Sequence, residues 1–368
     1  MRARTLGIET SCDETAVAVL DADGRIEFAL LSSQIATHAP FGGVVPEVAS
    51  REHLKALPVL VDQALQSAGG PPEVVAVTAG PGLVGALLVG VRFAAAFAWG
   101  RDIDLVAVDH LEGHQVSPFL DLNGGPAKKA PSPVLGLVAS GGHSAWYLGG
   151  PEQSTRLCRT RDDAAGETFD KVAKVLGLPY PGGPGVDRLA RLGQGVDTVF
   201  RQPRLKDGSH DFSFSGLKSA AIRELRSRGL EGLGDQKCGQ EGRDLMASFE
   251  AAIVRQLLKP VPGFVKEHRP ALITASGGVA ANTLLRRELE AMGTTLGVEV
   301  LLPPLALTTD NAAMIARAGQ LAWQRGRRDD ARRMDVIGRE VWHPPGMRRQ
   351  LERQKAALGT STTPPEEC

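Results

Sequence analysis

The feature that most constrains the fold is a strand–turn–strand pattern that occurs twice, at 6–21 (LGIETSCDETAVAVLD) and 136–148 (GLVASGGHSAWYL). In both segments, β-branched or aromatic residues flank a turn of small polar residues, which is typical of two strands joined by a short turn. A loop rich in Gly, Pro and Lys lies between them at 120–133. We therefore predict two lobes of related architecture.

Apolar strand patterns alternate with helical patterns after each of these segments. In the first lobe, 73–83 (EVVAVTAGPGL) and 104–110 (DLVAVDH) read as strands around a helix at 84–100. In the second lobe, 242–261 reads as an amphipathic helix, and 270–292 as strand, glycine turn and helix. This alternation predicts an α/β fold with largely parallel sheets. Ligands of such sheets bind beyond the carboxyl ends of the strands, where the glycine-rich turns fall.

Composition excludes several classes of protein. The chain has 368 residues, 42% hydrophobic and 23% charged, which is globular composition with room for two domains. Its 42 Lys and Arg balance 42 Asp and Glu, so net charge indicates no partner class. The 4 cysteines lack CxxC spacing, which argues against a disulfide scaffold or a zinc ribbon. We found no apolar run of about 18 residues and no signal-peptide core, so we expect a soluble cytoplasmic protein without a membrane role.

The end of the chain has a different composition. Basic residues outnumber acids between Arg325 and Lys355, which indicates either a surface that faces phosphates or a solvated helix end. Residues 347–368 lack periodicity and are expected to form a disordered tail.

Three turns of small residues, at 10–15, 140–144 and 276–282, follow predicted strands. Backbone N–H groups without bulky side chains can approach a phosphate closely, although a single such turn is more often structural. GxxxxGK[ST] does not occur, so the P-loop signature is missing, and the GxGxxG spacing at 80–85 (GPGLVG) is not a proper Rossmann fingerprint. Together the three turns suit a nucleotide clamped between two lobes.

His110 and His114 stand at i and i+4, on one face of a short helix, where two imidazoles can share a metal. Glu112 is not placed as in the HExxH motif of zinc proteases. Asp310 is the best candidate for a third ligand, although an Asp before a helix can equally be an N-cap. Without that third ligand, the histidines are ordinary polar surface.

The segment 162–171 clusters acids beside Lys171. Acids at a helix start favour the helix dipole, so this cluster is either helix capping or, through Asp170 and Lys171, a ligand contact. Lys218 enters a helix from the loop 212–218 and is either a phosphate contact or simply solvated.

Taken together, the motifs resemble the TsaD family, the tRNA adenosine threonylcarbamoyltransferases once called Gcp or O-sialoglycoprotein endopeptidases. No single motif is unique, but nine in family order are highly specific. The motifs, between residue 7 and about residue 318, are GIETSCDETAVAV, FGGVVPEVASREH, TAGPGLVGALLVG, HLEGH, LVASGGHS, DDAAGETFDKVAKVLGLPYPGGP, FSFSGLKSA, SGGVAANTLLR and TDNAAMIA.

The resemblance implies an actin/Hsp70/sugar-kinase-like fold, with two related lobes around a central nucleotide cleft. It implies a lobe at 1–127, a lobe at 128–310 and a helical segment at 311–346 that packs back toward the first lobe. It also implies transfer of a threonylcarbamoyl group from threonylcarbamoyl-AMP to N6 of adenosine 37, in tRNAs reading codons that begin with A.

By position, the resemblance implies that His110, His114 and Asp310 hold one divalent metal, iron first and zinc as the alternative. Ser11, Asp13 and Glu14 should line the phosphate side of the cleft. The expected contacts to the adenine nucleotide or threonylcarbamoyl-AMP are Val138, Ala139, Ser140, Gly141, Gly142, Asp170, Gly183, Asp187 and Asn282.

Ala139, Ser144 and Thr308 depart from the commonest family residues, and none of them removes a proposed ligand. The resemblance implies a tRNA anticodon loop as substrate, a TsaB-type paralogue, a TsaE-type ATPase and a YrdC-type synthase as partners. The helix at 84–100 is either the TsaB interface or buried inside the lobe. Three alternative functions remain. They are a metalloprotease, a small-molecule kinase or carbamoyltransferase of the same fold, and a non-enzymatic nucleotide-gated scaffold.

Overall fold

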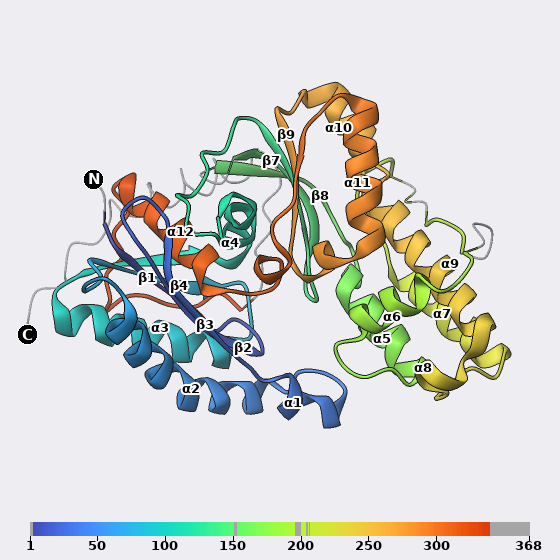
Figure 1. Cartoon of the computed structure of the whole chain (residues 1–368), viewed down its shortest axis with the longest axis horizontal. Coiled ribbons are helices and arrows are strands. Elements are labelled where there is room, and N and C mark those ends of the chain that lie inside the picture. Colours follow the sequence, from blue (N-terminus) through green and yellow to red (C-terminus); the bar gives the residue numbers. More distant parts are fainter. Residues whose placement is uncertain (1–2, 151–152, 196–199, 204, 206, 339–368) are drawn as a thin grey trace, which may run out of the picture.

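The computed structural model describes residues 3–150, 153–195, 200–203, 205 and 207–338. Two five-stranded sheets form the centres of two lobes (Figure 1). Their strand orders are β3-β2-β1-β4-β5 and β10-β9-β6-β7-β8. The expected tail at 347–368 lies outside the described residues.

The first sheet starts with an antiparallel meander, to which two parallel strands are added through β1. Its strands are β1 (Thr5–Glu9), β2 (Glu14–Leu20), β3 (Ile26–Ser33), β4 (Val74–Gly80) and β5 (Asp104–Asp109). β1 (TLGIE) is buried along its whole length, including the polar residues Thr5 and Glu9 at its two ends.

The second sheet repeats this plan. β7 pairs antiparallel with β6 and β8, and β9 lies parallel to both β6 and β10. Its strands are β6 (Val134–Ala139), β7 (Ser144–Gly150), β8 (Gln153–Arg159), β9 (Leu272–Ser276) and β10 (Val300–Leu301). The relation between the lobes expected from the two hairpins is therefore present in the topology, although the domain boundaries stay predictions.

The expectation of largely parallel sheets was wrong, because half of the described pairings in each sheet are antiparallel. The reason lies in the turns at 10–13 and 140–143. Parallel neighbours need a long crossover, whereas turns this short can only reverse the chain.

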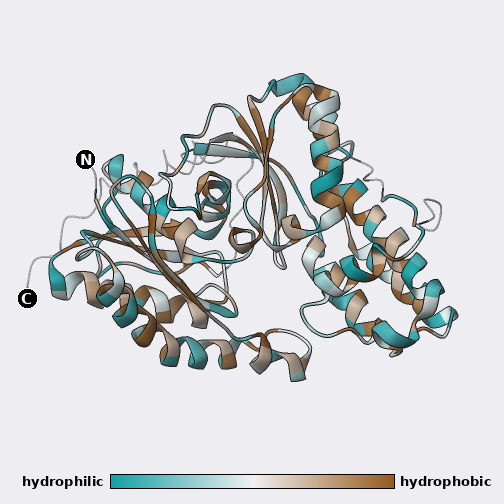
Figure 2. Cartoon of the chain, in the orientation of Figure 1, coloured by the Kyte–Doolittle hydropathy of each residue, from teal (hydrophilic) through white to brown (hydrophobic). Residues whose placement is uncertain are grey.

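Helices cover both faces of the first sheet. One face packs against α2 (Pro46–Ser67) and α3 (Val84–Arg101), and the other against α12 (Ala312–Gln324). α12 approaches β1 so closely that a Cβ at Gly7 would lie 2.3 Å from the Ala312 carbonyl oxygen. Two apolar clusters, one on each face, form the core of this lobe (Figure 2).

The apolar helix α3 corrects one expectation. Among the described residues it is long and apolar enough, by length and composition, to cross a membrane, although no such run was expected. It packs instead against β4 and α2, and 44% of its residues are buried. We therefore assign it as a helix of the first lobe whose buried side belongs to the core.

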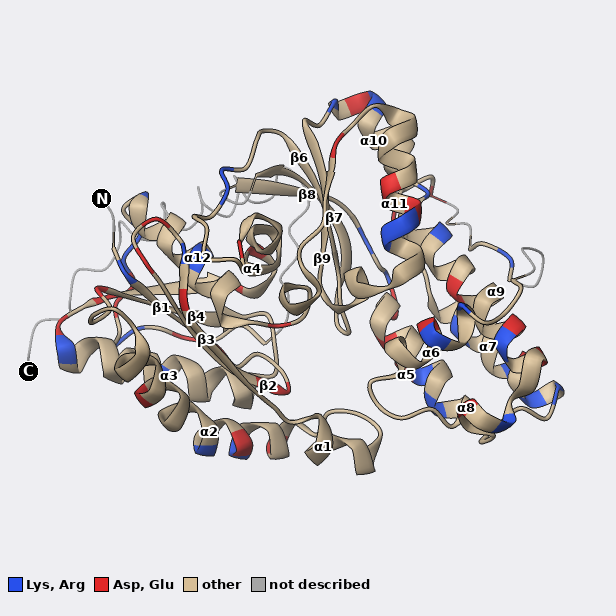
Figure 3. Cartoon of the chain, in the orientation of Figure 1, with Lys and Arg blue, Asp and Glu red and all other residues tan. Residues whose placement is uncertain are grey.

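The second lobe is mostly helical beyond its sheet, and many of its charged residues lie on these helices (Figure 3). Phe169 and Phe249 stack edge to face at 5.6 Å within its core. The helices are α5 (Ala165–Leu176), α6 (Gly182–Ala190), α7 (Ser215–Ser227), α8 (Gly234–Lys237), α9 (Gly239–Leu258), α10 (Val261–His268) and α11 (Thr283–Leu296).

The remaining short elements lie in the connections. α1 (Ile35–His38) and 3-10 turns at Ala39–Phe41, Ser117–Phe119, Gly278–Ala281 and Leu305–Leu307 join the larger elements. α4 (His110–Val116) follows β5 directly and packs against α12, β6 and β9. It thus lies between the two sheets (Figure 1).

Candidate metal and nucleotide site

α4 places the two predicted metal ligands on one face. The Asp109 carboxylate accepts hydrogen bonds from the backbone N–H of Leu111 at 2.8 Å and of Glu112 at 3.3 Å, so the helix begins at His110. The rings of His110 and His114 then lie with their centroids 4.6 Å apart. Both side chains are buried.

Asp310 completes the cluster. Its Oδ1 lies 3.4 Å from His110 Nε2 and 3.2 Å from His114 Nε2. The three ligand atoms lie within 4.8 Å of one another. The alternative that Asp310 is an N-cap was wrong, because the Asn311 side chain caps α12 by accepting from Met314 N at 2.9 Å.

The donor set fits a divalent metal. His114 is fully buried, and the 3.2 Å contact of its Nε2 with Asp310 Oδ1 lacks hydrogen-bond geometry, so neither ring nitrogen is hydrogen-bonded among the described residues. A buried polar atom left without a partner is costly, and a bound cation would remove that cost. Two imidazoles and one carboxylate suit Zn²⁺ or Fe²⁺, and three protein ligands leave a position for substrate.

Attraction between His110 and the carboxylates of Asp310 and Glu9 stabilises the charged forms of all three groups. Burial alone would lower the pKa of His110, but the carboxylates of Asp310 and Glu9 outweigh burial and raise that pKa well above its usual value. Burial lowers the pKa of His114, and the neighbouring His110 charge adds to the effect. Burial opposes ionisation of Asp310, but both histidines together lower its pKa.

Sequence reasoning missed Glu9, which ends β1 and is fully buried. Its Oε2 lies 3.1 Å from His110 Nδ1 and accepts a hydrogen bond from the Thr78 hydroxyl at 2.6 Å. Its Oε1 accepts from Ser11 N at 2.5 Å. The available signal was an acid at the end of an otherwise apolar strand, where an unpaired charge would be costly.

The three phosphate-side candidates lie in the β1–β2 turn and at the start of β2, next to this cluster. Ser11 Oγ is 3.3 Å from His110 Nδ1. Asp13 Oδ2 accepts a hydrogen bond from the Tyr180 hydroxyl at 3.3 Å, which joins the two lobes. Burial raises the pKa of Glu14 to about 8, helped by the charges of Asp310 and Asp13.

The turn after β6 approaches the cluster from the second lobe. Val138 and Ala139 are buried in β6. In the turn itself, Ser140 N donates to the His143 carbonyl oxygen at 2.8 Å, and His143 N donates to Ser140 Oγ at 3.2 Å. A Cβ built at Gly141 would have no described atom within 4 Å, and the same holds at Gly142. Both glycines therefore leave open space for a ligand.

His143 is a second residue that sequence reasoning missed. Burial, together with the charges of His110 and His114, lowers its pKa to about 4, so its imidazole is neutral at physiological pH. α4, which carries both histidines of the metal cluster, contacts β6, the strand that leads into this turn.

The other predicted ligand contacts make structural bonds. The Asp170 carboxylate accepts from Gly182 N at 2.7 Å at the start of α6, beside the exposed space at Gly183. Burial raises the pKa of Asp170, and the charge of Asp13 contributes. Asp187 accepts from the Thr283 backbone N–H at 2.8 Å.

Asn282 caps α11, accepting from Leu285 N at 2.8 Å, and donates to Glu250 Oε1 at 2.5 Å. Glu250 was missed in the sequence because it resembles any polar position of α9. Burial raises its pKa to about 8, and the neighbouring Asp187 charge contributes. These three side chains thus join α6, α9 and α11.

Lys171, considered as a ligand contact, and Lys218, considered as a phosphate contact, are both paired with acids. Lys171 Nζ lies 3.1 Å from Asp163 Oδ1 and 2.7 Å from Glu167 Oε1. Lys218 forms an ion pair with Asp163. Because these acids already neutralise the ammonium groups, the helix-start cluster is mainly structural.

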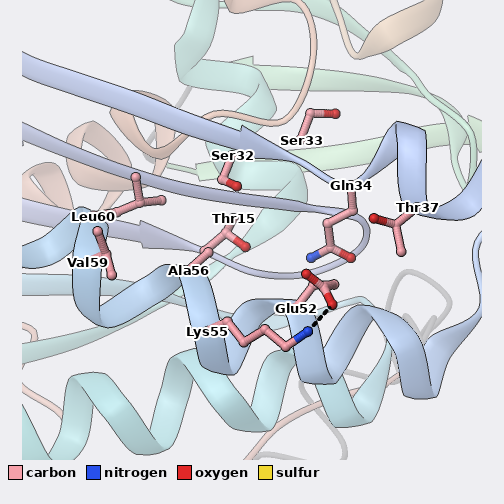
Figure 4. Close-up of a pocket in the computed structure, with 10 residues that line it drawn as sticks. All are labelled: Thr15, Ser32, Ser33, Gln34, Thr37, Glu52, Lys55, Ala56, Val59 and Leu60. Carbon is pink, nitrogen blue, oxygen red and sulfur yellow. Dashed lines mark hydrogen bonds and ion pairs between the residues drawn. The ribbon is translucent and has the colours of Figure 1, made fainter.

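A cavity of about 260 Å³ lies behind the phosphate-side turn, between β2, β3 and α2 (Figure 4). Thr15 and Gln34 line it. Thr15 Oγ1 is 2.8 Å from His53 Nδ1, and His53 Nε2 is 3.0 Å from the Cys12 carbonyl oxygen. The cavity therefore contacts the back of the turn rather than the metal cluster.

The described part of the basic segment is largely paired. Arg328 Nε lies 2.6 Å from Asp104, Arg327 Nε lies 3.2 Å from Asp329, and Arg332 Nε lies 3.4 Å from Asp330. Its remaining arginines from 339 onward lie outside the described residues.

Comparison with known proteins assigns the family. A family model described as "TsaD: tRNA N6-adenosine threonylcarbamoyltransferase" matches residues 26–317. A protein of that name from Anaeromyxobacter sp. is 48% identical over 335 residues, covering 89% of this chain and 97% of its own. Another, from Geobacter metallireducens, is 45% identical over 326 residues, covering 87% of this chain and 92% of its own.

Solved structures agree with the architecture. Full-length HypF, in a phosphate- and nucleotide-bound form, matches with a TM-score of 0.57 at 15% identity, covering 89% of this chain and 56% of HypF. HypF from T. kodakarensis matches with a TM-score of 0.56, also at 15% identity, and the match covers 88% of this chain and 48% of that HypF chain. The chain spans about half the length of these HypF chains, and the likeness concerns the actin/Hsp70/sugar-kinase-like fold. With its fold and its relatives in agreement, the chain belongs to the TsaD family of tRNA N6-adenosine threonylcarbamoyltransferases.

Proposed function

We propose that this chain transfers the threonylcarbamoyl group of threonylcarbamoyl-AMP to N6 of adenosine 37, in tRNAs reading codons that begin with A. The observation that carries the proposal is the meeting of His110, His114 and Asp310 with the first-lobe turn that holds Ser11. The metal-binding group and the turn expected to line the phosphate side therefore lie next to each other.

The chemistry of the donor defines what the site must do. Threonylcarbamoyl-AMP is a mixed anhydride of a carbamate and a phosphate, so it is already activated. The exocyclic amine of adenine is a weak nucleophile, because its lone pair is delocalised into the ring. The protein must therefore hold the amine near the carbonyl carbon and stabilise charge on the carbonyl oxygen.

The residues divide this work. His110, His114 and Asp310 would hold Fe²⁺ or Zn²⁺, which supplies a Lewis acid for an oxygen of the donor. The open backbone at Gly141 and Gly142 suits the adenylate, because an amide without a side chain can approach it closely. The target adenosine must leave the stack of its loop to reach this site, which favours the anticodon loop as substrate.

The partners belong to the same proposal. We expect a YrdC-type synthase to supply threonylcarbamoyl-AMP, and TsaB-type and TsaE-type proteins to assist turnover. A groove between α2 and α3, lined by Leu54, Pro58, Val89 and Phe93, supports docking of the TsaB-type paralogue there. Trp99, also on α3, is 75% exposed and adds a second large apolar side chain to the surface of this helix.

The test is the dependence of donor consumption on tRNA. With threonylcarbamoyl-AMP and the partners present, AMP release should require tRNA with adenosine at position 37. A tRNA with guanosine there should give only the background rate. Equal AMP release without tRNA would favour the rival, a small-molecule carbamoyltransferase.

A further inference from the structure

Glu9 occupies an unusual position for a charged residue. It is fully buried between β1, β4 and α4, yet it accepts hydrogen bonds on both carboxylate oxygens. One of these oxygens also lies 3.1 Å from Nδ1 of His110, whose opposite ring nitrogen, Nε2, is on the side of Asp310. The Glu9 carboxylate thus contacts the side of the His110 ring that faces away from the candidate metal position.

We propose that Glu9 is the positioning residue of the metal site: by accepting the Nδ1–H of His110, it fixes the tautomer and ring orientation that direct Nε2 at the metal. This inference rests on the proposed metal site. It concerns a residue that would not touch the metal itself.

The argument follows from the chemistry of imidazole. A neutral histidine carries a hydrogen on one ring nitrogen and a lone pair on the other, so only one of its tautomers can bind a metal through Nε2. A carboxylate beside Nδ1 can only accept, and therefore selects the tautomer with hydrogen on Nδ1. Such carboxylate–histidine–metal arrangements also make the ligand more basic.

Glu9 cannot easily turn away from His110. Ser11 N–H holds its Oε1 at 2.5 Å, and the Thr78 hydroxyl holds its Oε2 at 2.6 Å. Since Ser11 belongs to the phosphate-side turn, the same carboxylate joins that turn to the metal ligand. His114 lacks a corresponding anchor among the described residues, so His110 is the preoriented half of the pair.

A purely structural role is the alternative, in which Glu9 only satisfies the backbone of the turn. Glu9→Gln separates the two possibilities. Its amide can no longer accept on both atoms: with oxygen toward Ser11 N–H, its NH₂ faces His110 Nδ1 and selects the wrong tautomer. The matched control is Thr78→Val, which removes the other side-chain donor to Oε2 and leaves the His110 contact in place.

The experiment measures Zn²⁺ affinity by competition with a chromophoric chelator, and the thermal midpoint of each variant without metal. Glu9→Gln should weaken Zn²⁺ binding by about 10- to 100-fold, as loss of an outer partner does at other sites. Thr78→Val should leave affinity within about threefold, as expected if the His110 contact is intact. In zinc-loaded wild type, nuclear magnetic resonance should detect a His110 Nδ1–H that is protected from exchange.

If a folded Glu9→Gln variant binds Zn²⁺ as tightly as wild type, the inference is overturned. It is also overturned if Glu9→Gln and Thr78→Val lose Zn²⁺ affinity equally. If Glu9→Gln does not fold, Glu9→Asp replaces it, and Zn²⁺ affinity unchanged by the shortened carboxylate would count against positioning. Failure of the metal site itself gives a different result. In that case His114→Ala would bind Zn²⁺ as tightly as wild type.

Discussion

Asp310 Oδ1 lies 3.2 Å from His114 Nε2, although the two residues belong to distant parts of the chain. β5 leads into α4, which carries the histidine, and the chain passes through the whole second lobe before it returns to the first sheet as α12. The candidate metal site therefore forms only when that return is complete.

Removal of a single imidazole should empty the site. His110→Ala is expected to lose about one metal per chain, because two remaining ligands hold a divalent ion poorly. Elemental analysis of the purified proteins measures this, with His268→Ala, a histidine on α10, as the control. Full metal content in His110→Ala would mean that the ion is held elsewhere.

Gly141→Val should weaken adenine-nucleotide binding at least tenfold, about 1.4 kcal/mol, and leave the fold intact. Its Cβ would meet no described atom within 4 Å, so only a ligand would be obstructed. Calorimetry of nucleotide binding and circular dichroism test the two halves of the prediction. Unchanged affinity would place the nucleotide away from this turn.

Gly277 is the contrasting glycine. It has a φ of +87°, and its Cβ would lie 2.3 Å from the Ala139 carbonyl oxygen. Gly277→Val should therefore lower the free energy of unfolding, by about 1–3 kcal/mol from backbone strain alone. Denaturant unfolding measures it, and a stability equal to that of Gly141→Val would contradict the packing of the second-lobe turns.

Glu250 should make stability depend on pH. Its pKa rises from 4.5 in the reference state to about 8 in the folded protein, because burial disfavours the charged form. Between these values the folded state keeps a proton that the unfolded state has released, so stability should fall as pH rises from 4.5 to 8. Urea unfolding at a series of pH values measures this slope.

Glu250→Gln should reduce that slope, because the amide is a permanent analogue of the protonated acid. It can still accept from Asn282 while its NH₂ faces Asp187. Glu290→Gln, at an exposed position of α11, is the control and should leave the slope unchanged. The same slope in wild type and Glu250→Gln would refute a protonated Glu250.

Leu54→Glu tests the partner surface. Leu54 is 62% exposed and lines the α2–α3 groove, so a charge there should disrupt an apolar interface without unfolding the lobe. Co-purification with the TsaB-type partner should be lost. Leu192→Glu, at a 57% exposed leucine of the second lobe, should bind normally. Loss of binding in both variants would indicate a nonspecific effect.

The sequence was informative where local pattern decides structure. Both hairpins were predicted because apolar alternation and short polar turns are local signals, and the i and i+4 spacing placed His110 and His114 on one helical face. The alternation of strands and helices predicts too many parallel pairs, because the short turns at 10–13 and 140–143 reverse the chain and make β1–β2 and β6–β7 antiparallel.

The remaining parts depended on contacts across the chain. Asp310 and Asn311 are both good capping residues, and only the packing of α12 decides which one caps. Glu9 and Glu250 look like ordinary acids until the fold buries them beside His110 and Asn282. Lys218 looks available until Asp163 is brought to it.

The most direct test of the proposed function is the modified nucleoside itself. Metal-loaded chain, synthase, threonine, bicarbonate, ATP and tRNA are combined, the TsaB-type and TsaE-type partners are added stepwise, and adenosine 37 is analysed by mass spectrometry. We predict threonylcarbamoyladenosine at that position, efficient turnover only with the partners, and none with His114→Ala. Absence of the product with every partner present and metal bound would contradict the transferase assignment.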